Sequence, residues 1–179
     1  ELVDLDDHFD ASKPLRIGGF TINDFHGKRR VLSVPEGFIY SSNIGTAKMA
    51  DVVGIKGHRQ FLKRMGLLDR METELPEVAH PTEPREWKKL HSITISYGHG
   101  VATTPLQTAM AAVATVNGGK LFPPTFLPRT EEEANAIATQ VISPETSAKV
   151  RYLMRLNVEK GSGRRAEVPG YYVGGKTGT

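Results

Sequence analysis

The sequence predicts a mainly α-helical piece with short β-strands, and three observations carry this prediction. Apolar residues recur at helical spacing in several segments, and three of these begin with Ser or Thr and a proline in the first turn. β-Prone residues in the first part of the chain occur only in short runs around glycines. The segment Tyr171–Val173 is a β-prone run that leads into Gly, Lys and Thr residues.

The composition indicates a globular protein. The chain has 179 residues, which suffices for one domain or a large piece of one, and 39% of them are hydrophobic and 24% charged. The formal net charge is +3 and the basic pairs are scattered, which favours solvated surface over a nucleic-acid site. No apolar run reaches the roughly 18 residues that span a bilayer, and no signal peptide opens the chain; either could lie upstream.

Cysteine and histidine usage argues against a metal site. There is no cysteine, which removes disulfides, thiol nucleophiles and zinc–thiolate sites. The six histidines are scattered, without the i, i+4 pairing of a helical metal site. We therefore expect no metal, and we predict no cofactor.

The first part of the chain is predicted as a loop, a hairpin and a short helix. Residues 1–14 are expected to form a loop with solvated acidic side chains, and residues 15–25 a small hairpin around Gly18-Gly19. A short helix is predicted to begin at Ser33, because Ser33 can cap it and Glu36 stands at the capping-box position.

A second helix is expected to follow Ser41-Ser42-Asn43 and to be broken by Gly54 and Gly57. Its apolar side would hold Ile44, Ala47 and Val52. A further helical stripe would be closed by Gly66 in the C′ position. That stripe consists of Phe61, Leu62 and Met65.

The middle of the chain is predicted as a surface excursion followed by a buried helix. Residues 67–92 are rich in proline and acidic groups, and Trp87 and Leu90 are expected to hold them down. Thr104 can cap a helix whose first residue is Pro105. Residues 109–116 are almost wholly apolar, and a helix that is apolar on all sides is buried.

The last third is predicted as a connecting region and a closing helix. Residues 120–142 form the connection, in which Glu131–Glu133 either open a short helix or make a solvated face. The closing helix would begin at Ser143-Pro144 and end at Gly161-Ser162-Gly163. Its inward residues would be Val150, Leu153 and Met154.

Two motifs overlap at the closing segment, beside the simpler interpretation of a glycine-rich turn. Gly170-x-x-x-x-Gly175-Lys176-Thr177 matches the phosphate-binding P-loop pattern. Lys176-Thr177-Gly178 matches the third motif of penicillin-binding proteins and serine β-lactamases. A P-loop must follow a strand and open a helix, whereas here the most strand-like residues lie inside the would-be loop. This spacing disfavours nucleotide binding.

Taken with Ser41-x-Asn43, the closing motif resembles the penicillin-binding transpeptidases, and the division-type class B enzymes above all. The resemblance covers roughly residues 15–179. The stretches that carry it are Ser41-Ser42-Asn43-Ile44-Gly45, Tyr97-Gly98-His99-Gly100, Thr104-Pro105-Leu106-Gln107, Gly161-Ser162-Gly163 and Gly175-Lys176-Thr177-Gly178-Thr179. It implies a mainly α fragment of the α/β serine β-lactamase and transpeptidase fold, ending in the strand that carries Lys-Thr-Gly.

One departure bears directly on activity. The family's nucleophile lies in a Ser-x-x-Lys motif upstream of Ser41, and no serine of this chain has a lysine three residues later. We therefore expect residues 1–179 to be a partial transpeptidase domain. The nucleophile-bearing N-terminal part and the C-terminal strands and helix would lie outside it.

The resemblance implies a role for each motif residue. The Thr179 amide would be one donor of the oxyanion hole, and the segment Thr177-Gly178-Thr179 would bind substrate, its two hydroxyls holding the terminal carboxylate. Lys176 would supply a positive field and hydrogen-bond toward Ser41, which would relay a proton to the leaving nitrogen. The Asn43 amide would hold a substrate backbone carbonyl and the lysine of the absent Ser-x-x-Lys motif. The resemblance gives His99 no catalytic role, so we interpret it as structural.

The intact protein is thus expected to cross-link D-Ala-D-Ala stem peptides of peptidoglycan and to be acylated by β-lactams. Its expected location is the bacterial inner membrane, facing the periplasm. Its expected partners are division proteins, including a lipid-linked glycan polymerase. A non-catalytic cell-wall or partner-binding module remains the second alternative beside the P-loop protein.

Overall fold

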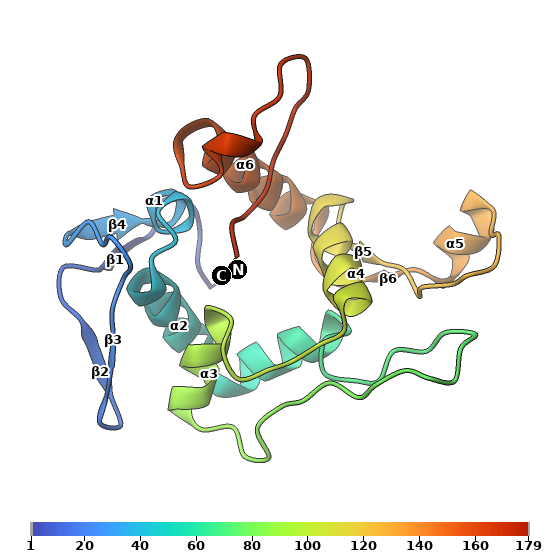
Figure 1. Ribbon diagram of the computed structural model, residues 1–179, viewed down its shortest axis with the longest axis horizontal. Coiled ribbons are helices and arrows are strands. Elements are labelled where there is room, and N and C mark those ends of the chain that lie inside the picture. The colour runs from blue at the N-terminus through green and yellow to red at the C-terminus, as the bar shows by residue number, and fades with distance from the viewer. Residues whose placement is uncertain (1, 179) are drawn as a thin grey trace. The chain divides into compact units, whose positions relative to one another are not determined.

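The structure is a computed structural model that describes residues 2–178. Two compact units make up this part of the chain. The first holds residues 2–58, 86–99 and 151–178, and the second holds Arg59–Arg85 and Gly100–Val150. Helices dominate the secondary structure (Figure 1), which confirms the prediction of a mainly α piece. The helices are α1(Val34–Ile39), α2(Asn43–Arg64), α3(Lys89–Ser96), α4(Pro105–Val116), α5(Glu131–Ile137), α6(Pro144–Lys160) and the 3₁₀ turn η1(Arg164–Ala166).

The strands are short and form separate antiparallel pairs. β2(Leu15–Ile17) and β3(Phe20–Ile22) make the hairpin predicted around Gly18-Gly19, whose positive φ angles of 54° and 83° suit a two-residue turn. β1(His8–Asp10) pairs with β4(Val31–Ser33), so the prediction of a loop over residues 1–14 is wrong there. A three-residue strand that pairs with a segment more than twenty residues away leaves no periodic signal in its own sequence. β5(Lys120–Leu121) pairs with β6(Thr139–Gln140) in the second unit.

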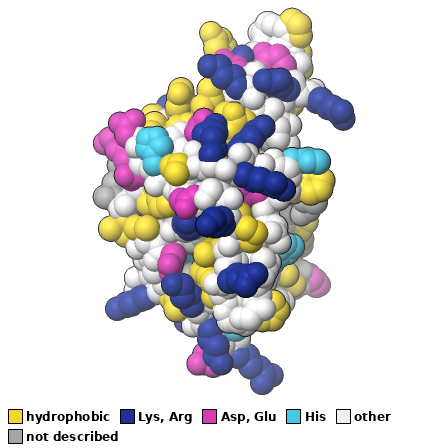
Figure 2. All heavy atoms as spheres, turned by 90° about the vertical axis from the view of Figure 1, so that its left-hand side faces the viewer, with side chains coloured by type: hydrophobic (Ala, Val, Ile, Leu, Met, Phe, Trp, Pro, Cys, Tyr) yellow, Lys and Arg dark blue, Asp and Glu magenta, His cyan; other side chains and the backbone are white. Residues whose placement is uncertain are grey.

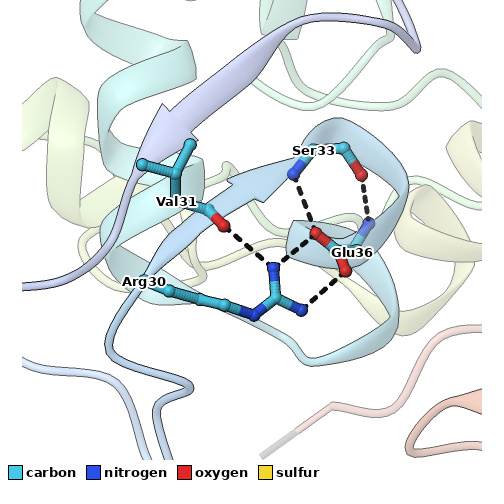
Figure 3. A network of polar contacts seen from close by, with 4 residues as sticks. All are labelled: Arg30, Val31, Ser33 and Glu36. Carbon is cyan, nitrogen blue, oxygen red and sulfur yellow. Dashed lines mark hydrogen bonds and ion pairs between the residues drawn. The ribbon is translucent and has the colours of Figure 1, made fainter.

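Helix α1 begins at the predicted cap. Ser33 Oγ accepts from the Glu36 amide at 3.3 Å, and the Glu36 carboxylate accepts from the Ser33 amide at 3.2 Å. Arg30 joins this capping box through two bonds to Glu36, of 2.6 and 2.8 Å (Figure 3). The guanidinium of Arg30 lowers the pKa of Glu36 to about 2. The start of α1 is therefore fixed by local sequence.

Helix α2 breaks at the first of the two predicted glycines but not at the second. Gly54 departs from helical geometry, with φ 75° and ψ 163°, and marks a kink, but the helix resumes and continues through Gly57 to Arg64. Ile44 and Ala47 are buried as predicted. Val52 is 53% exposed, so its predicted inward placement is wrong. The core of the first unit gathers residues from β3, β4, α2 and α3, together with one residue directly after β1. Its members are Ala11, Ile22, Leu32, Ile44, Ala47 and Ile93.

In the second unit, α2 ends at the predicted glycine. Gly66 has φ 74°, and the amides of Gly66 and Leu67 donate to the carbonyls of Lys63 and Leu62 at 2.9 and 3.0 Å. This pair of bonds is the Schellman motif. The core of this unit consists of Met65, Ala111, Ala114 and Val141.

Helix α4 begins at Thr104 and Pro105 as predicted, but it is not buried on all sides. Only Gln107, Ala111 and Ala114 of this helix are buried, while Val113 is 44% exposed. The apolar composition does not distinguish the packed face from the others, because alanine and valine occur on all of them.

The remaining segments refine the predictions. Helix α5 forms with Thr130 as its cap, so Glu131–Glu133 lie in its first turn. The excursion after Gly66 carries no helix or strand up to Lys88 apart from a bridge between Thr82 and Ala102. It ends earlier than predicted, because α3 begins at Lys89.

Helix α6 has the predicted start, and Leu153 is buried while Val150 and Met154 are partly buried. The predicted strand at Tyr171–Val173 is not formed, and 172–178 has no regular secondary structure. A strand needs a pairing neighbour, whereas here the Gly175 amide donates to the carbonyl of Met154 in α6 at 3.1 Å. This closing segment runs beside α6 (Figure 1).

The surface carries mixed charge. On the face drawn in Figure 2, Lys and Arg side chains are distributed with acidic and hydrophobic side chains between them. Within residues 2–178, none of the helices has the length and hydropathy to cross a bilayer.

Candidate active site

The first motif lies where α1 ends. The amide of Ser42 donates to the carbonyl of Gly37 at 2.9 Å and that of Ser41 to Phe38 at 3.2 Å, which is the same Schellman pattern as at Gly66. The left-handed position is held here by Ser41, with φ 52°. A side chain in this region costs roughly 1–2 kcal/mol, so the structure accepts strain in order to place a hydroxyl there.

Ser42 is held in place by the carboxylate of Asp24, a residue that the sequence analysis did not single out. Ser42 is 2% exposed, and its hydroxyl donates to Asp24 Oδ2 at 2.7 Å. Asp24 Oδ1 accepts from the Ile44 amide at 2.9 Å, and Ser42 Oγ accepts from the Gly45 amide at 2.9 Å. A negatively charged carboxylate at the start of α2 also interacts favourably with the positive end of the helix dipole. Asp24 thereby fixes the turn from Ser41 to Asn43.

Asn43 is the first residue of α2, and its side chain is held at the end of the hairpin. Its amide nitrogen donates to the carbonyl of Asn23 at 3.1 Å. One of the two amide hydrogens is thus engaged by the backbone, while the other hydrogen and the carbonyl oxygen can face a ligand. Its role in holding a substrate carbonyl stays a prediction.

Lys176 reaches the first motif from the other end of the sequence. Its ammonium donates to the Ser41 hydroxyl oxygen across 135 positions of sequence, and to the carbonyl of Thr177 at 3.1 Å. The Phe38 ring centroid lies 5.8 Å from Lys176 Nζ. Partial desolvation of this amine lowers the pKa of Lys176, although the residue as a whole stays exposed. The structure thus brings Ser41 and Lys176 together in the first unit.

The other residues of the closing motif lie beside this contact. The Thr177 hydroxyl is 2.7 Å from that of Ser162, and 3.5 Å from Lys176 Nζ. Gly178 is exposed, with no atom within 4 Å of where a Cβ would lie. Thr179, predicted to supply an oxyanion donor and a hydroxyl, lies outside the described residues.

Helix α6 supplies the anchors of the closing segment, and the sequence analysis missed them too. Asn157 Nδ2 donates to the carbonyl of Gly175 at 2.9 Å, and Arg155 Nη1 donates to that of Val173 at 2.9 Å. Arg155 is itself paired with Glu159 and Glu167. Nothing in the helical pattern of α6 marks Arg155 or Asn157 as functional residues. Only the neighbouring stretch Gly161-Ser162-Gly163 belongs to the motifs recognised in the sequence.

The geometry does not form a phosphate cradle. The Gly175 amide, which a P-loop would direct at phosphate, donates to the carbonyl of Met154 instead. Residues 2–178 also contain no group of three His, Cys, Asp or Glu side chains placed to hold a metal. The His99 ring contacts that of Tyr97, with 5.7 Å between the centroids, and its interpretation as a structural residue stays a prediction.

Comparison with known proteins agrees with this geometry. A family described as "Penicillin binding protein transpeptidase domain" matches residues 2–179. The chain is 41% identical over 174 residues to "Probable peptidoglycan D,D-transpeptidase FtsI" of Caulobacter vibrioides, covering 96% of this chain and 29% of that protein. It is 33% identical over 167 residues to "Stage V sporulation protein D" of Bacillus subtilis, covering 86% of this chain and 25% of that protein.

Solved structures give the same result for the fold. The transpeptidase domain of Burkholderia pseudomallei penicillin-binding protein 3, in its apo form, superimposes with a TM-score of 0.88 at 28% identity, covering 98% of this chain and 54% of that one. The chain therefore spans less than a third of the two relatives' length and about half of this structural neighbour.

Proposed function

Because the chain belongs to the penicillin-binding protein transpeptidase family, we propose that the intact protein is a serine-type peptidoglycan D,D-transpeptidase. The observation that carries this proposal is the contact between Lys176 and Ser41. A hydroxyl is a weak acid in water, and a neighbouring ammonium makes it a competent proton relay. The P-loop alternative has no support in the geometry of the closing segment.

The reaction begins with a serine nucleophile that this sequence does not contain, since no Ser-x-x-Lys occurs in it. That serine attacks the carbonyl between the two D-alanines of a stem peptide and forms an acyl-enzyme, releasing the terminal D-alanine. Ser41 delivers a proton to the departing nitrogen, with Lys176 holding the hydroxyl in place. A β-lactam follows the same course, but its opened ring stays attached.

Substrate binding falls to the closing motif and to Asn43. The terminal carboxylate of the stem peptide lies against Thr177, Gly178 and Thr179, close to the positive charge of Lys176. The Asn43 side chain receives a backbone carbonyl of the substrate. The Thr179 amide completes the oxyanion hole together with the amide of the nucleophile, and such donors are worth about 2.7–4 kcal/mol each in the transition state.

The cellular setting is also part of the proposal. The relative from Caulobacter vibrioides supports a role in division, and the intact protein then acts at the septum. It is anchored in the inner membrane by a segment outside residues 1–179, and its catalytic domain faces the periplasm. Its partners are division proteins, among them a polymerase that uses lipid-linked glycan precursors.

Labelling with a fluorescent penicillin tests this function. The intact protein is expected to become covalently labelled, and an excess of unlabelled penicillin is expected to prevent it. The isolated 179-residue chain is expected to stay unlabelled, because it carries no Ser-x-x-Lys. Labelling of the isolated chain would show that the nucleophile is misassigned, and no labelling of the intact protein would reject the function.

A further inference from the structure

Asn157 is a fully buried polar residue whose side-chain amide joins the closing segment, at Gly175, to the loop that follows α6, at Ser162. It lies in α6, and its relative exposure is 0%. Nδ2 donates to the carbonyl of Gly175 at 2.9 Å, and Oδ1 accepts from the amide and the hydroxyl of Ser162, both at 3.1 Å. A buried amide is costly unless its groups are paired, so an amide satisfied in this way fixes its partners as firmly as they fix it.

The chemistry of these partners allows one orientation of the Asn157 amide. The Gly175 carbonyl can only accept, so it must face the NH₂ group, and the Ser162 backbone N–H can only donate, so it must face the oxygen. Rotating the amide by 180° would break both bonds. The donor and acceptor at this position therefore follow from the backbone around them.

The same logic sets the direction of the next hydrogen bond. The Ser162 hydroxyl has one hydrogen, which it donates to Asn157 Oδ1. Its contact of 2.7 Å with the Thr177 hydroxyl must then use the hydrogen of Thr177. Asn157 thus orients Thr177, a residue of the proposed carboxylate-binding segment, through Ser162.

This cluster also touches the end of α1. The Ser162 amide lies 3.1 Å from the carbonyl of Ile39, two residues before Ser41. A Cβ at Gly161 would lie 2.3 Å from Asn157 Oδ1 and 2.8 Å from the Ile39 carbonyl oxygen, so only glycine allows this close approach. The two sides of the Ser41–Lys176 contact therefore share one support.

We propose that Asn157 is a positioning residue for acyl transfer. It holds the backbone of Gly175 so that Lys176 meets Ser41, and it orients the Thr177 hydroxyl through Ser162. Asn157 does not touch the reacting atoms. This inference rests on the proposed transpeptidase function, because the reaction that it supports is the acylation described above.

The substitution Asn157→Asp in the intact protein tests the proposal. It keeps an acceptor for Ser162 but replaces the donor to the Gly175 carbonyl by an oxygen. We expect the rate constant of acylation by a fluorescent penicillin to fall by about 10-fold to 100-fold, because small displacements of positioned groups have effects of that order. The penicillin dissociation constant should change less. Ser162→Ala, which leaves the Asn157 amide in place, should give a smaller loss of the same kind.

Ser147→Ala is the matched control. Ser147 is another fully buried polar residue of α6, and its hydroxyl bonds to Gly118 and Thr115 in the second unit. Ser147→Ala should lower the melting temperature while leaving the rate constant of acylation within about twofold of that of the unsubstituted protein. An equal loss of acylation in Ser147→Ala would reduce Asn157 to a structural residue and overturn the proposal.

Amide hydrogen exchange of the Gly175 N–H separates this inference from the proposed function. Asn157→Asp should accelerate that exchange, because the bond from Gly175 to Met154 loses its neighbouring support. Faster exchange in a protein that penicillin never labels would reject the function, and with it the role in acyl transfer, while showing that Asn157 still holds the Gly175 backbone. Unchanged exchange and unchanged acylation in Asn157→Asp would overturn the inference while the function stands.

Discussion

Two helices of this chain end in the same pair of backbone hydrogen bonds but with different residues at the left-handed position. Helix α2 ends with Gly66 at φ 74°, and α1 ends with Ser41 at φ 52°. Glycine occupies this position without cost, whereas serine is strained by its Cβ. The difference teaches that the end of α1 is built for a hydroxyl and the end of α2 only for a turn.

The surroundings of the two turns differ in the same sense. Beside Gly66, the Gln107 amide donates to the carbonyls of Gly66 and Asp69 at 3.0 and 2.9 Å, which satisfies the helix end. Beside Ser41 stand a lysine that contacts its hydroxyl and a carboxylate, Asp24, that holds the next residue. Strain that is supported by charged neighbours is typical of a functional position.

Removing the ammonium group of Lys176 should have the largest effect on acylation. Lys176→Ala in the intact protein takes away the donor to Ser41 and the positive field beside the substrate carboxylate. We expect acylation by penicillin to slow by about 10²–10³-fold, as for the loss of one preorganised electrostatic donor. Lys160→Ala, an exposed lysine at the end of α6, is the control. Acylation kinetics within a few fold of the unsubstituted protein would remove Lys176 from the site.

Removing the carboxylate should loosen the turn itself. Asp24→Ala leaves the Ser42 hydroxyl and the Ile44 amide without their acceptor, and a hydrogen bond to a charged group contributes about 1.5–3 kcal/mol. We expect the free energy of unfolding, measured in urea, to fall by about 2 kcal/mol and acylation to slow with it. Asp51→Ala, which breaks only an exposed ion pair with Lys89, should change stability by less than about 1 kcal/mol.

Exchanging the residues at the two helix ends tests the comparison directly. Ser41→Gly should raise the free energy of unfolding by about 1 kcal/mol while acylation is lost, because the strain and the hydroxyl disappear together. Gly66→Ser should lower it by about 1 kcal/mol with acylation unchanged. The measurements are urea unfolding and penicillin labelling of the intact protein. Loss of stability in Ser41→Gly would show that the hydroxyl, and not the turn, holds this end together.

The sequence predicts the parts of the site that local rules determine. The cap at Ser33, the glycine end at Gly66 and the helix start at Thr104 follow from residues within one turn. Asp24 and Asn157 could not be predicted in the same way. The partners of Asp24 and the Gly175 partner of Asn157 are 18–20 residues away along the chain, and no periodicity marks them. The prediction of a strand at Tyr171–Val173 was wrong for a related reason. A strand forms only where a second strand lies beside it, and the β-propensity of a segment does not show whether one does.

The start of α1 offers the smallest and most specific test. Glu36 binds Arg30 and the Ser33 amide, and its pKa falls from an ordinary value of 4.5 to about 2. A lowered pKa means that the ionised form stabilises the fold above about pH 4.5, and that this contribution is lost as the pH falls from 4.5 toward 2. Because this carboxylate is about one third exposed and solvent screens it, we expect Glu36→Gln to lower the free energy of unfolding by only about 0.5–1 kcal/mol at pH 7.

Urea unfolding of Glu36→Gln at several pH values tests this expectation. The deficit in the free energy of unfolding relative to the unsubstituted protein should shrink as the pH drops from 4.5 toward 2. Glu145→Gln, at an exposed glutamate of α6, is the control substitution. A deficit that stayed constant from pH 7 to pH 3 would mean that the charge of Glu36 does not contribute to the stability of α1.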